Sequence, residues 1–304
     1  MKTFEELIGQ PHIKARLNFA LKAKKVDRPI PAFLFVGGLG NGKTEFARAF
    51  AEELGSQEFY ELNCGGIKDA DTFIHIYMDK IQDQDISILW DESHKLPDDV
   101  VTLLLTVLNT GSNSIRSVSC NGFEMEFDFS RQTFLFATTE PQKLFPPLKS
   151  RMEALTIESY TDAELQEIID NNCPGIILTD DTLKDLVESS RGTPRSCVQL
   201  AEKVIDYCKI NRKKNFGSKD LANLRAEANV RLHGLESVEV EILGLLKKNG
   251  PMILRSIASS LNLSSASISN SYENFLTRKG LLKIDGKRMI TPKGMQILKQ
   301  IKEK

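Results

Sequence analysis

The chain has 304 residues, of which 41% are hydrophobic and 27% are charged. This length predicts two or three domains, and the composition is that of a globular protein. Residues 235–304 carry 12 Lys and Arg against 6 Asp and Glu, a net charge of +6, while the rest of the chain carries −7. A basic segment on an acidic body indicates nucleic acid as a partner, although a solvated basic face explains the charge equally well.

The sequence argues against membrane and metal–thiolate proteins. No apolar run is long enough to span a bilayer, and the first ten residues, MKTFEELIGQ, lack the core of a signal peptide. The five cysteines form no CxxC pair and are odd in number, which disfavours a disulfide framework or a zinc site. We therefore expect a cytoplasmic protein with reduced thiols and no membrane partner.

The first half of the chain alternates strand-like and helix-like segments. Apolar runs predict buried strands, and apolar residues at helical spacing, such as Phe46, Ala49 and Phe50, predict helices. The strands are expected at 32–38, 86–92 and 131–139, and the helices at 44–54 and 100–109. This alternation predicts a parallel α/β sheet in a first domain of residues 1–156.

A glycine-rich segment, GGLGNGKT, joins the first strand to the following helix. It fits the phosphate-binding pattern G-x-x-x-x-G-K-[ST], and a strand before it and a helix after it are the context that the pattern requires. Gly37, Gly40 and Gly42 permit a tight loop whose N–H groups face phosphate oxygens, and the helix N-terminus adds partial positive charge. Lys43 is expected to reach the outer phosphates, and the Thr44 hydroxyl to ligate Mg²⁺.

The second and third strands end in polar residues that complete this predicted site. Asp91 and Glu92 follow the second strand, at the carboxyl edge where open α/β sheets bind ligands. Asp91 suits Mg²⁺, and Glu92 is placed to orient and polarise a water molecule for phosphoryl transfer. Thr139 ends the third strand; its hydroxyl could satisfy local backbone groups, but we favour a role in sensing phosphate or holding the water. His94 is interpreted as a polar cap of its loop, with a coupling role as the second interpretation.

An insertion separates the second and third strands. Residues 114–120 and 123–129 flank Asn121-Gly122, and Asn-Gly between two strand-like runs is a strong hairpin signal. Apolar and acidic residues alternate along the second arm, so that one face is apolar and the other is acidic. Because an acidic face is a poor phosphate ligand, the hairpin is interpreted as a cover of the core.

Two further domains are predicted after Arg151. Helical segments that begin at Thr161, Thr179, Thr193 and Ser218 indicate a small all-helical domain of residues 157–230, in which the threonines are cap signals.

Residues 231–304 read as three helices followed by a strand, an Asp-Gly turn and a second strand, with Gly280 as a C-cap. This order describes a winged helix-turn-helix, a DNA-binding motif, although a protein-docking module has the same pattern. Cations are few in the third helix, so Lys283, Lys287 and Arg288 of the hairpin are the candidates for contacts with phosphate or the minor groove.

Taken together, these motifs resemble those of AAA+ ATPases, and the chain is similar to the RuvB family of Holliday junction branch migration helicases. FEELIGQPHIKARL resembles the amino-terminal box of the family, which implies an adenine pocket around Ile8, Gly9 and Gln10. GGLGNGKT, ILWDESHKL and FATT resemble its Walker A, Walker B and sensor 1 motifs. Departures, such as Glu140 in place of an arginine, are those expected of a divergent or virus-encoded member.

The same resemblance gives roles to residues beyond these motifs. PPLKSRM resembles the arginine-finger segment, which implies that Arg151 acts on the γ-phosphate bound by a neighbouring subunit. RGTPRS resembles sensor 2, which implies that Arg195 reaches the γ-phosphate from the helical lid, and Tyr160 lies where the family has a nucleotide-contacting tyrosine. The implied catalytic residues are therefore Glu92, Thr139, Arg151 and Arg195, with ATP and Mg²⁺ as cofactors.

The leading hypothesis is an ATP-driven motor that translocates duplex DNA and drives branch migration. The resemblance implies a homo-oligomer, a hexamer-like ring, and a RuvA-like junction-binding partner. The segment KSRM also resembles clamp loaders, so a loader-type or initiator-type ATPase in DNA replication is the alternative. A non-enzymatic DNA-binding regulator is a third hypothesis, against which the intact Lys43, Asp91 and Glu92 argue.

Overall fold

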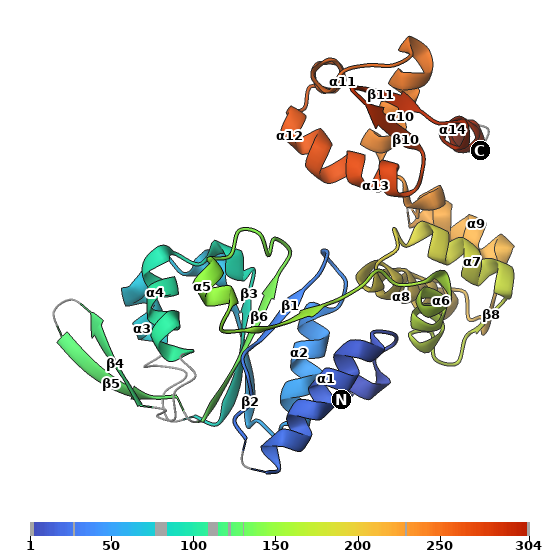
Figure 1. The fold of residues 1–304 in the computed structure, drawn as a ribbon. Helices are drawn as coiled ribbons and strands as arrows, with labels where there is room; N and C mark the ends of the chain where they lie inside the picture. The colour runs from blue at the N-terminus through green and yellow to red at the C-terminus, as the bar shows by residue number, and fades with distance from the viewer. Residues whose placement is uncertain are drawn as a thin grey trace. The chain divides into compact units, whose positions relative to one another are not determined.

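The computed structural model describes residues 3–26, 28–76, 84–108, 115–120, 123–129, 131–228 and 230–302. The chain forms two compact units, one of Met1–Glu164 with Thr193–Arg195 and the other of Leu165–Gly192 with Ser196–Lys304. Figure 1 gives the course of the chain through both. The division into three domains predicted from the sequence stays a prediction.

A five-stranded sheet of order β2-β3-β6-β1-β7 is the centre of the first unit, and all of its strand pairs are parallel. The strands are β1 (Phe33–Val36), β2 (Glu58–Asn63), β3 (Ile86–Asp91), β6 (Gln132–Thr138) and β7 (Glu153–Thr156). This confirms the predicted parallel α/β sheet. The three strands expected from the sequence are its three central ones, because strands covered on both faces read as continuous apolar runs.

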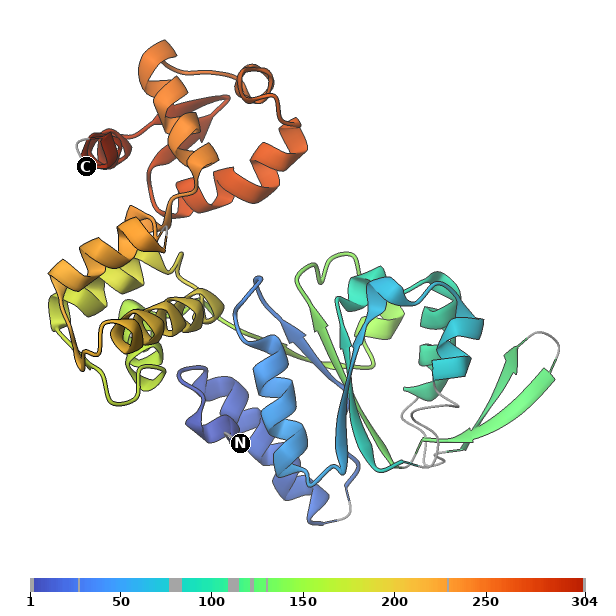
Figure 2. The same ribbon diagram turned by 180° about the vertical axis from the view of Figure 1, so that it is seen from behind.

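Helices cover both faces of this sheet (Figures 1 and 2). On one side lie α1 (Pro11–Lys24) and α2 (Lys43–Glu53), and on the other lie α3 (Ala70–Ile76), α4 (Asp98–Val107) and α5 (Pro146–Lys149). Short 3-10 turns are η1 (Phe4–Glu6), η2 (Cys64–Gly66) and η4 (Ser93–Lys95). Successive residues of β1 supply both cores, since Phe33 and Phe35 pack with α1 and α2 while Leu34 joins the opposite cluster.

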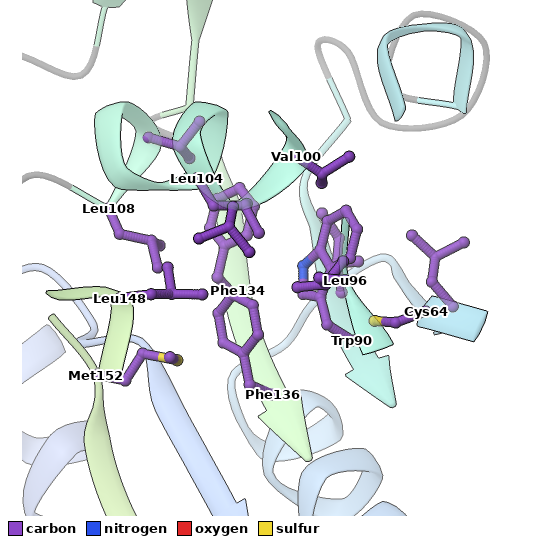
Figure 3. Packing of buried hydrophobic residues seen from close by; sticks show 14 of the residues in the cluster. Cys64, Trp90, Leu96, Val100, Leu104, Leu108, Phe134, Phe136, Leu148 and Met152 are labelled. Carbon is purple, nitrogen blue, oxygen red and sulfur yellow. The ribbon is translucent and has the colours of Figure 1, made fainter. Parts of the chain in front are cut away.

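Trp90, the one tryptophan of the chain, lies fully buried in the core between the sheet and α4. Its ring centroid is 6.2 Å from that of Phe136 and 5.5 Å from that of Phe73. Figure 3 shows Leu104 of α4 and Leu148 of α5 among the side chains that fill this cluster. Because Trp90 directly precedes Asp91, the packing of its ring fixes the end of β3 from which the two acidic residues emerge.

The predicted hairpin is present as β4 (Ile115–Cys120) and β5 (Phe123–Asp128), an antiparallel pair separate from the main sheet. The Asn121-Gly122 turn lies outside the described residues. Phe129 at the base of the hairpin is buried in the core, and Glu126 and Asp128 are exposed. Figure 1 shows the two strands extending away from the sheet, which does not fit their interpretation as a cover of the core.

The helices predicted for 157–230 are present as α6 (Asp162–Asn171), α7 (Asp180–Ser189), α8 (Pro194–Ile210) and α9 (Ser218–Glu227). Thr179 caps α7, since its hydroxyl oxygen accepts a hydrogen bond from the Thr182 N–H. The expectation of an all-helical region is wrong in one detail. A short parallel pair, β8 (Ile177–Leu178) and β9 (Asn215–Phe216), joins two connections, and two-residue strands are too short to leave a periodic pattern.

The predicted winged helix is confirmed in residues 232–302. It contains η5 (Leu232–Gly234), α10 (Ser237–Asn249), α11 (Leu254–Leu261) and the antiparallel strands β10 (Leu282–Asp285) and β11 (Lys287–Ile290). A last helix, α14 (Pro292–Lys302), was not predicted from the sequence. The third helix comprises α12 (Ser265–Ser267), a π-helical turn η6 (Ile268–Glu273) and α13 (Asn274–Arg278). Gly280 follows it with a φ of 70°, as a C-cap requires.

Among the described residues, no helix combines the length and apolarity needed to cross a membrane, and no cluster of His, Cys, Asp and Glu could hold a metal ion. Cys64, Cys173, Cys197 and Cys208 are buried free thiols. Burial raises the pKa of both Cys173 and Cys197 to about 11, so these thiols remain protonated at neutral pH.

Truncation of Leu104 tests the packing around Trp90. Leu104 is fully buried, so Leu104→Ala should lower the free energy of unfolding by about 2–5 kcal/mol. Urea unfolding followed by the fluorescence of Trp90 measures this loss. The control is Thr102→Ala on the exposed side of α4, which should change the unfolding free energy by less than about 1 kcal/mol. Equal effects of the two substitutions would contradict the packing described.

Candidate nucleotide-binding site

The glycine-rich loop lies between β1 and α2, as predicted. Its backbone is fixed at one end, where the Gly37 N–H donates a hydrogen bond to the carbonyl oxygen of Thr138 in β6 (3.3 Å). Gly40 and Gly42 have φ values of 77° and 93°, which favour glycine, and α2 begins immediately afterwards. The N–H groups at the start of α2 therefore adjoin the loop, an arrangement that binds phosphate.

Lys43 is the buried cation of this loop, with only 7% of its surface exposed. Its Nζ donates hydrogen bonds to the carbonyl oxygens of Gly37 (2.9 Å) and Gly38 (3.0 Å). Burial lowers the pKa of Lys43, while the carboxylates of Asp91 and Glu92 act to raise it. The negative charges of Asp91 and Glu92 thus act on the ammonium group, and phosphate oxygens would compete with the two carbonyls for it.

The two acidic residues at the end of β3 have different hydrogen-bond partners. The carboxylate of Asp91 accepts a hydrogen bond from the Glu92 N–H (2.9 Å). Glu92 has a φ of 53°, in the left-handed region. This conformation costs free energy for residues other than glycine. Its Oε2 accepts a hydrogen bond from the Thr139 hydroxyl (3.4 Å). The strained backbone therefore places Glu92 beside the end of β6, where the sequence predicts its partner threonine.

His94 does more than cap its loop. Its Nδ1 lies 2.9 Å from the Thr138 hydroxyl, and its Nε2 lies 3.4 Å from carboxylate oxygens of both Glu92 and Glu140. The imidazole is only 5% exposed. A hydrogen bond from Lys143 lowers the pKa of Glu140, so the second carboxylate is ionised at neutral pH. His94 therefore connects Glu92 to Thr138, at the end of β6, and to Glu140, which follows that strand.

The amino-terminal box meets the segment after β7. The Gln10 side chain exchanges two hydrogen bonds with the backbone of Glu158, as donor to its oxygen (3.1 Å) and as acceptor from its N–H (2.9 Å). Gly9 has a φ of 72°, and a Cβ there would lie 2.5 Å from an oxygen of Glu164. Ile8, the third residue of the expected adenine pocket, is half-buried. The box is thus fixed to a part of the chain 148 residues away.

Tyr160 and Arg195 both contact the backbone of the glycine-rich loop. The Tyr160 hydroxyl donates a hydrogen bond to the Asn41 carbonyl oxygen (3.1 Å), and burial raises the pKa of Tyr160 to about 12. The Arg195 N–H donates to the Gly40 carbonyl oxygen (3.2 Å), and its side chain is exposed. Both residues named by the family resemblance therefore adjoin the glycine-rich loop.

Arg151 is not part of this cluster of contacts. It follows α5, and its Nη1 donates a hydrogen bond to the Pro147 carbonyl oxygen (2.9 Å) within its own segment. This short helical turn holds the guanidinium group close to the chain that carries it. A role on the nucleotide of another subunit stays a prediction.

Several contacts of the site were not foreseen from the sequence, among them one of Glu164 and one of Tyr160. Glu164 lies against Gly9, and the Asn41 backbone binds Tyr160. The spacing Thr161-x-x-Glu164 is a capping-box pattern, and the Thr161 N–H does donate to the Glu164 carboxylate (2.7 Å). That pattern predicts the start of α6, but it contains nothing about Gly9.

The three cations predicted to contact DNA differ in their surroundings within the winged helix. Lys283 and Lys287 are exposed on β10 and β11. Arg288 instead forms two hydrogen bonds to Glu273 of the third helix, from Nε (2.6 Å) and Nη2 (3.1 Å), and Glu273 is only 3% exposed. This pairing raises the pKa of Arg288. Its geometry is that of a guanidinium holding the hairpin to the helix, and the expected contact of Arg288 with DNA stays a prediction.

Comparisons with known proteins agree with this geometry. Residues 1–157 match the family model described as the Holliday junction DNA helicase RuvB P-loop domain, and residues 232–299 match the RuvB C-terminal winged helix domain. The RuvB subunit of the Holliday junction branch migration complex of Mycoplasma genitalium is 26% identical over 97% of this chain and 96% of that protein. The corresponding subunit of Fusobacterium nucleatum is 26% identical over 100% of this chain and 93% of its own length.

Solved structures extend the similarity to three dimensions. The Thermotoga maritima RuvB Holliday junction branch migration motor matches with a TM-score of 0.78 and 26% identity, over 98% of this chain and 97% of that one. A point mutant of the same motor matches with a TM-score of 0.79 and 25% identity, over 98% of each chain. Since the P-loop model alone covers more than half of the sequence, the chain belongs to the RuvB family of Holliday junction DNA helicases.

Proposed function

We propose that this protein is an ATP-driven DNA motor that hydrolyses ATP at subunit interfaces, translocates duplex DNA and drives the branch migration of Holliday junctions. The meeting of Lys43, Glu92 and Thr139 beside one phosphate-binding loop carries this proposal. Its relatives are named as subunits of the Holliday junction branch migration complex. The basic winged helix supplies a surface for DNA, bound mainly through phosphate contacts.

Each part of the site has a role in this reaction. The N–H groups of the loop and the Lys43 ammonium group bind the phosphates, and Ile8, Gly9 and Tyr160 line the adenine end. Glu92, held by Thr139 and His94, orients and polarises the attacking water. The hydroxyl of Thr44 and the carboxylate of Asp91 are oxygen ligands that suit Mg²⁺, which would neutralise charge on the phosphates.

The remaining residues imply an assembly. Arg195 would reach the γ-phosphate from its own chain, while Arg151 would complete the site of a neighbouring subunit. A homo-oligomer, in the form of a hexamer-like ring, provides such interfaces, and a RuvA-like protein would deliver the junction in the cytoplasm. The alternative, a clamp-loader or initiator ATPase, is not supported, since both matched regions of the chain match RuvB models.

Substitution of Glu92 should separate binding of ATP from its hydrolysis. Glu92→Gln keeps the shape of the side chain but removes its ability to polarise water, so hydrolysis should fall by about 10²-fold or more. Binding of a fluorescent ATP analogue should be unchanged, whereas Lys43→Ala should abolish it. Phosphate release with DNA present measures the rate. The control is Glu61→Gln, an exposed carboxylate paired with Arg48. Wild-type hydrolysis by Glu92→Gln would contradict the assignment.

Mixing of two inactive variants tests whether Arg151 acts between subunits. Arg151→Ala should bind ATP normally and hydrolyse it about 10³-fold more slowly. A mixture of Arg151→Ala with Glu92→Gln should recover activity, because some interfaces then combine an intact Glu92 with an intact Arg151 of the neighbour. Lys149→Ala, in the same segment, is the control for a local change. If the mixture stays as inactive as its components, Arg151 does not act in trans.

Neutralisation of two lysines tests the DNA contacts. Lys283→Gln with Lys287→Gln should weaken binding of all DNA sequences alike and reduce the slope of log affinity against log salt by about 2. Fluorescence anisotropy of labelled duplex across salt concentrations gives both values. The matched control is Lys247→Gln with Lys248→Gln, an equal change of charge on exposed residues of α10. Equal losses in both double variants would indicate a general charge effect instead of contacts at the hairpin.

A further inference from the structure

The connection between α7 and α8 carries an arginine that the proposed mechanism does not use. Arg191 lies four residues before Arg195, with a φ of 58° in the left-handed region. Its side chain turns toward the winged helix, which belongs to the same compact unit as Arg191. A residue held in this strained conformation requires surroundings that over-determine it.

The guanidinium group of Arg191 is bound to the start of the winged helix. Nη1 and Nη2 donate parallel hydrogen bonds, each of 2.9 Å, to the two carboxylate oxygens of Glu239, and Nη1 also donates to the Gly234 carbonyl oxygen (2.8 Å). Glu239 is 0% exposed, and its carboxylate also accepts from the Glu236 N–H (2.7 Å). Such a two-pronged pair fixes both distance and angle, which a single point charge does not.

The same arginine is also bound to the third helix. Its Cζ lies 3.8 Å from the ring centroid of Phe275, a cation–π contact, and its carbonyl oxygen accepts a hydrogen bond from Nη2 of Arg278 (2.6 Å). Nearby, Glu188 pairs with His233 (2.9 Å). One residue between two lid helices therefore holds α10, the turn before it and the third helix of the winged domain.

The other end of the same short segment adjoins the nucleotide site, through the hydrogen bond from Arg195 to Gly40. Five residues, 191–195, thus run from an anchor in the winged helix to an anchor at the phosphate loop. A chain of this length spans at most about 14 Å from its first Cα to its last.

From these contacts we propose that Arg191 is the positioning residue that couples ATP hydrolysis to movement of DNA. Its bonds to Glu239, Phe275 and Arg278 make the winged helix follow the lid helices as one body, so that a displacement begun at Arg195 reaches the DNA. The pair with Glu239 supplies this rigidity, whereas its net contribution to folding is small, because the desolvation of two charges offsets most of their attraction. This inference rests on the motor function proposed above.

The test removes both charges together, because Arg191→Ala alone would leave the buried Glu239 unpaired and could prevent folding. The double variant Arg191→Gln, Glu239→Gln loses the clamp without an uncompensated charge. Arg191→Lys, which keeps the charge but not the two-pronged geometry, is the second variant. The matched control is Arg225→Gln, Asp185→Asn, which removes a charge pair between two lid helices of the same unit.

The measured quantity is the number of ATP molecules hydrolysed per synthetic four-way junction dissociated, with duplex binding recorded in parallel. The double variant should keep its ATPase rate and DNA affinity within about twofold while this number rises about tenfold, and Arg191→Lys should give an intermediate value. The control should match wild type. A ratio unchanged in both Arg191 variants would overturn the coupling role. If wild-type protein dissociates no junctions, the motor function itself fails, which is a different outcome.

Discussion

The site depends on one constraint, an ammonium group buried in a loop of glycines. Lys43 cannot be placed there without compensation, because burial disfavours its charged form. Asp91 and Glu92 supply the compensation, and the packing of Trp90 brings them to the end of β3. The order of the sheet then places Thr138 and Thr139, at the end of β6, next to those carboxylates. A triphosphate fits this arrangement since it brings negative charge to a cation that the protein has already partly dehydrated.

Much of the fold could be predicted from the sequence, because its determinants are local. The three central strands are apolar runs, and the phosphate loop is a motif of eight successive residues. The edge strands β2 and β7, each with a neighbouring strand on one side only, mix polar with apolar residues and therefore do not read as strands in the sequence. The short pair β8 and β9 depends on the meeting of two connections, which periodicity does not record.

Some functional residues likewise follow from local motifs, whereas others depend on contacts between distant parts of the chain. Lys43, Asp91 and Glu92 follow from motifs, but the bonds between Gln10 and Glu158 join residues 148 positions apart. The pair of Arg191 with Glu239, 48 positions apart, and that of Arg288 with Glu273 likewise depend on tertiary structure. A cation in a sequence shows only that charge is present. Its partner decides whether it meets DNA, a nucleotide or another part of the protein.

The π-helical turn in the third helix of the winged domain has an evolutionary consequence. Such a turn corresponds to one residue inserted into an α-helix. Deleting one residue from η6 would restore regular geometry but rotate everything after it by about 100° relative to everything before. Glu273 and Phe275, which meet Arg288 and Arg191, would then leave their partners. The exposed Asn270 and Ser271 can therefore vary by substitution, while the length of this helix is held fixed by what it binds on its buried side.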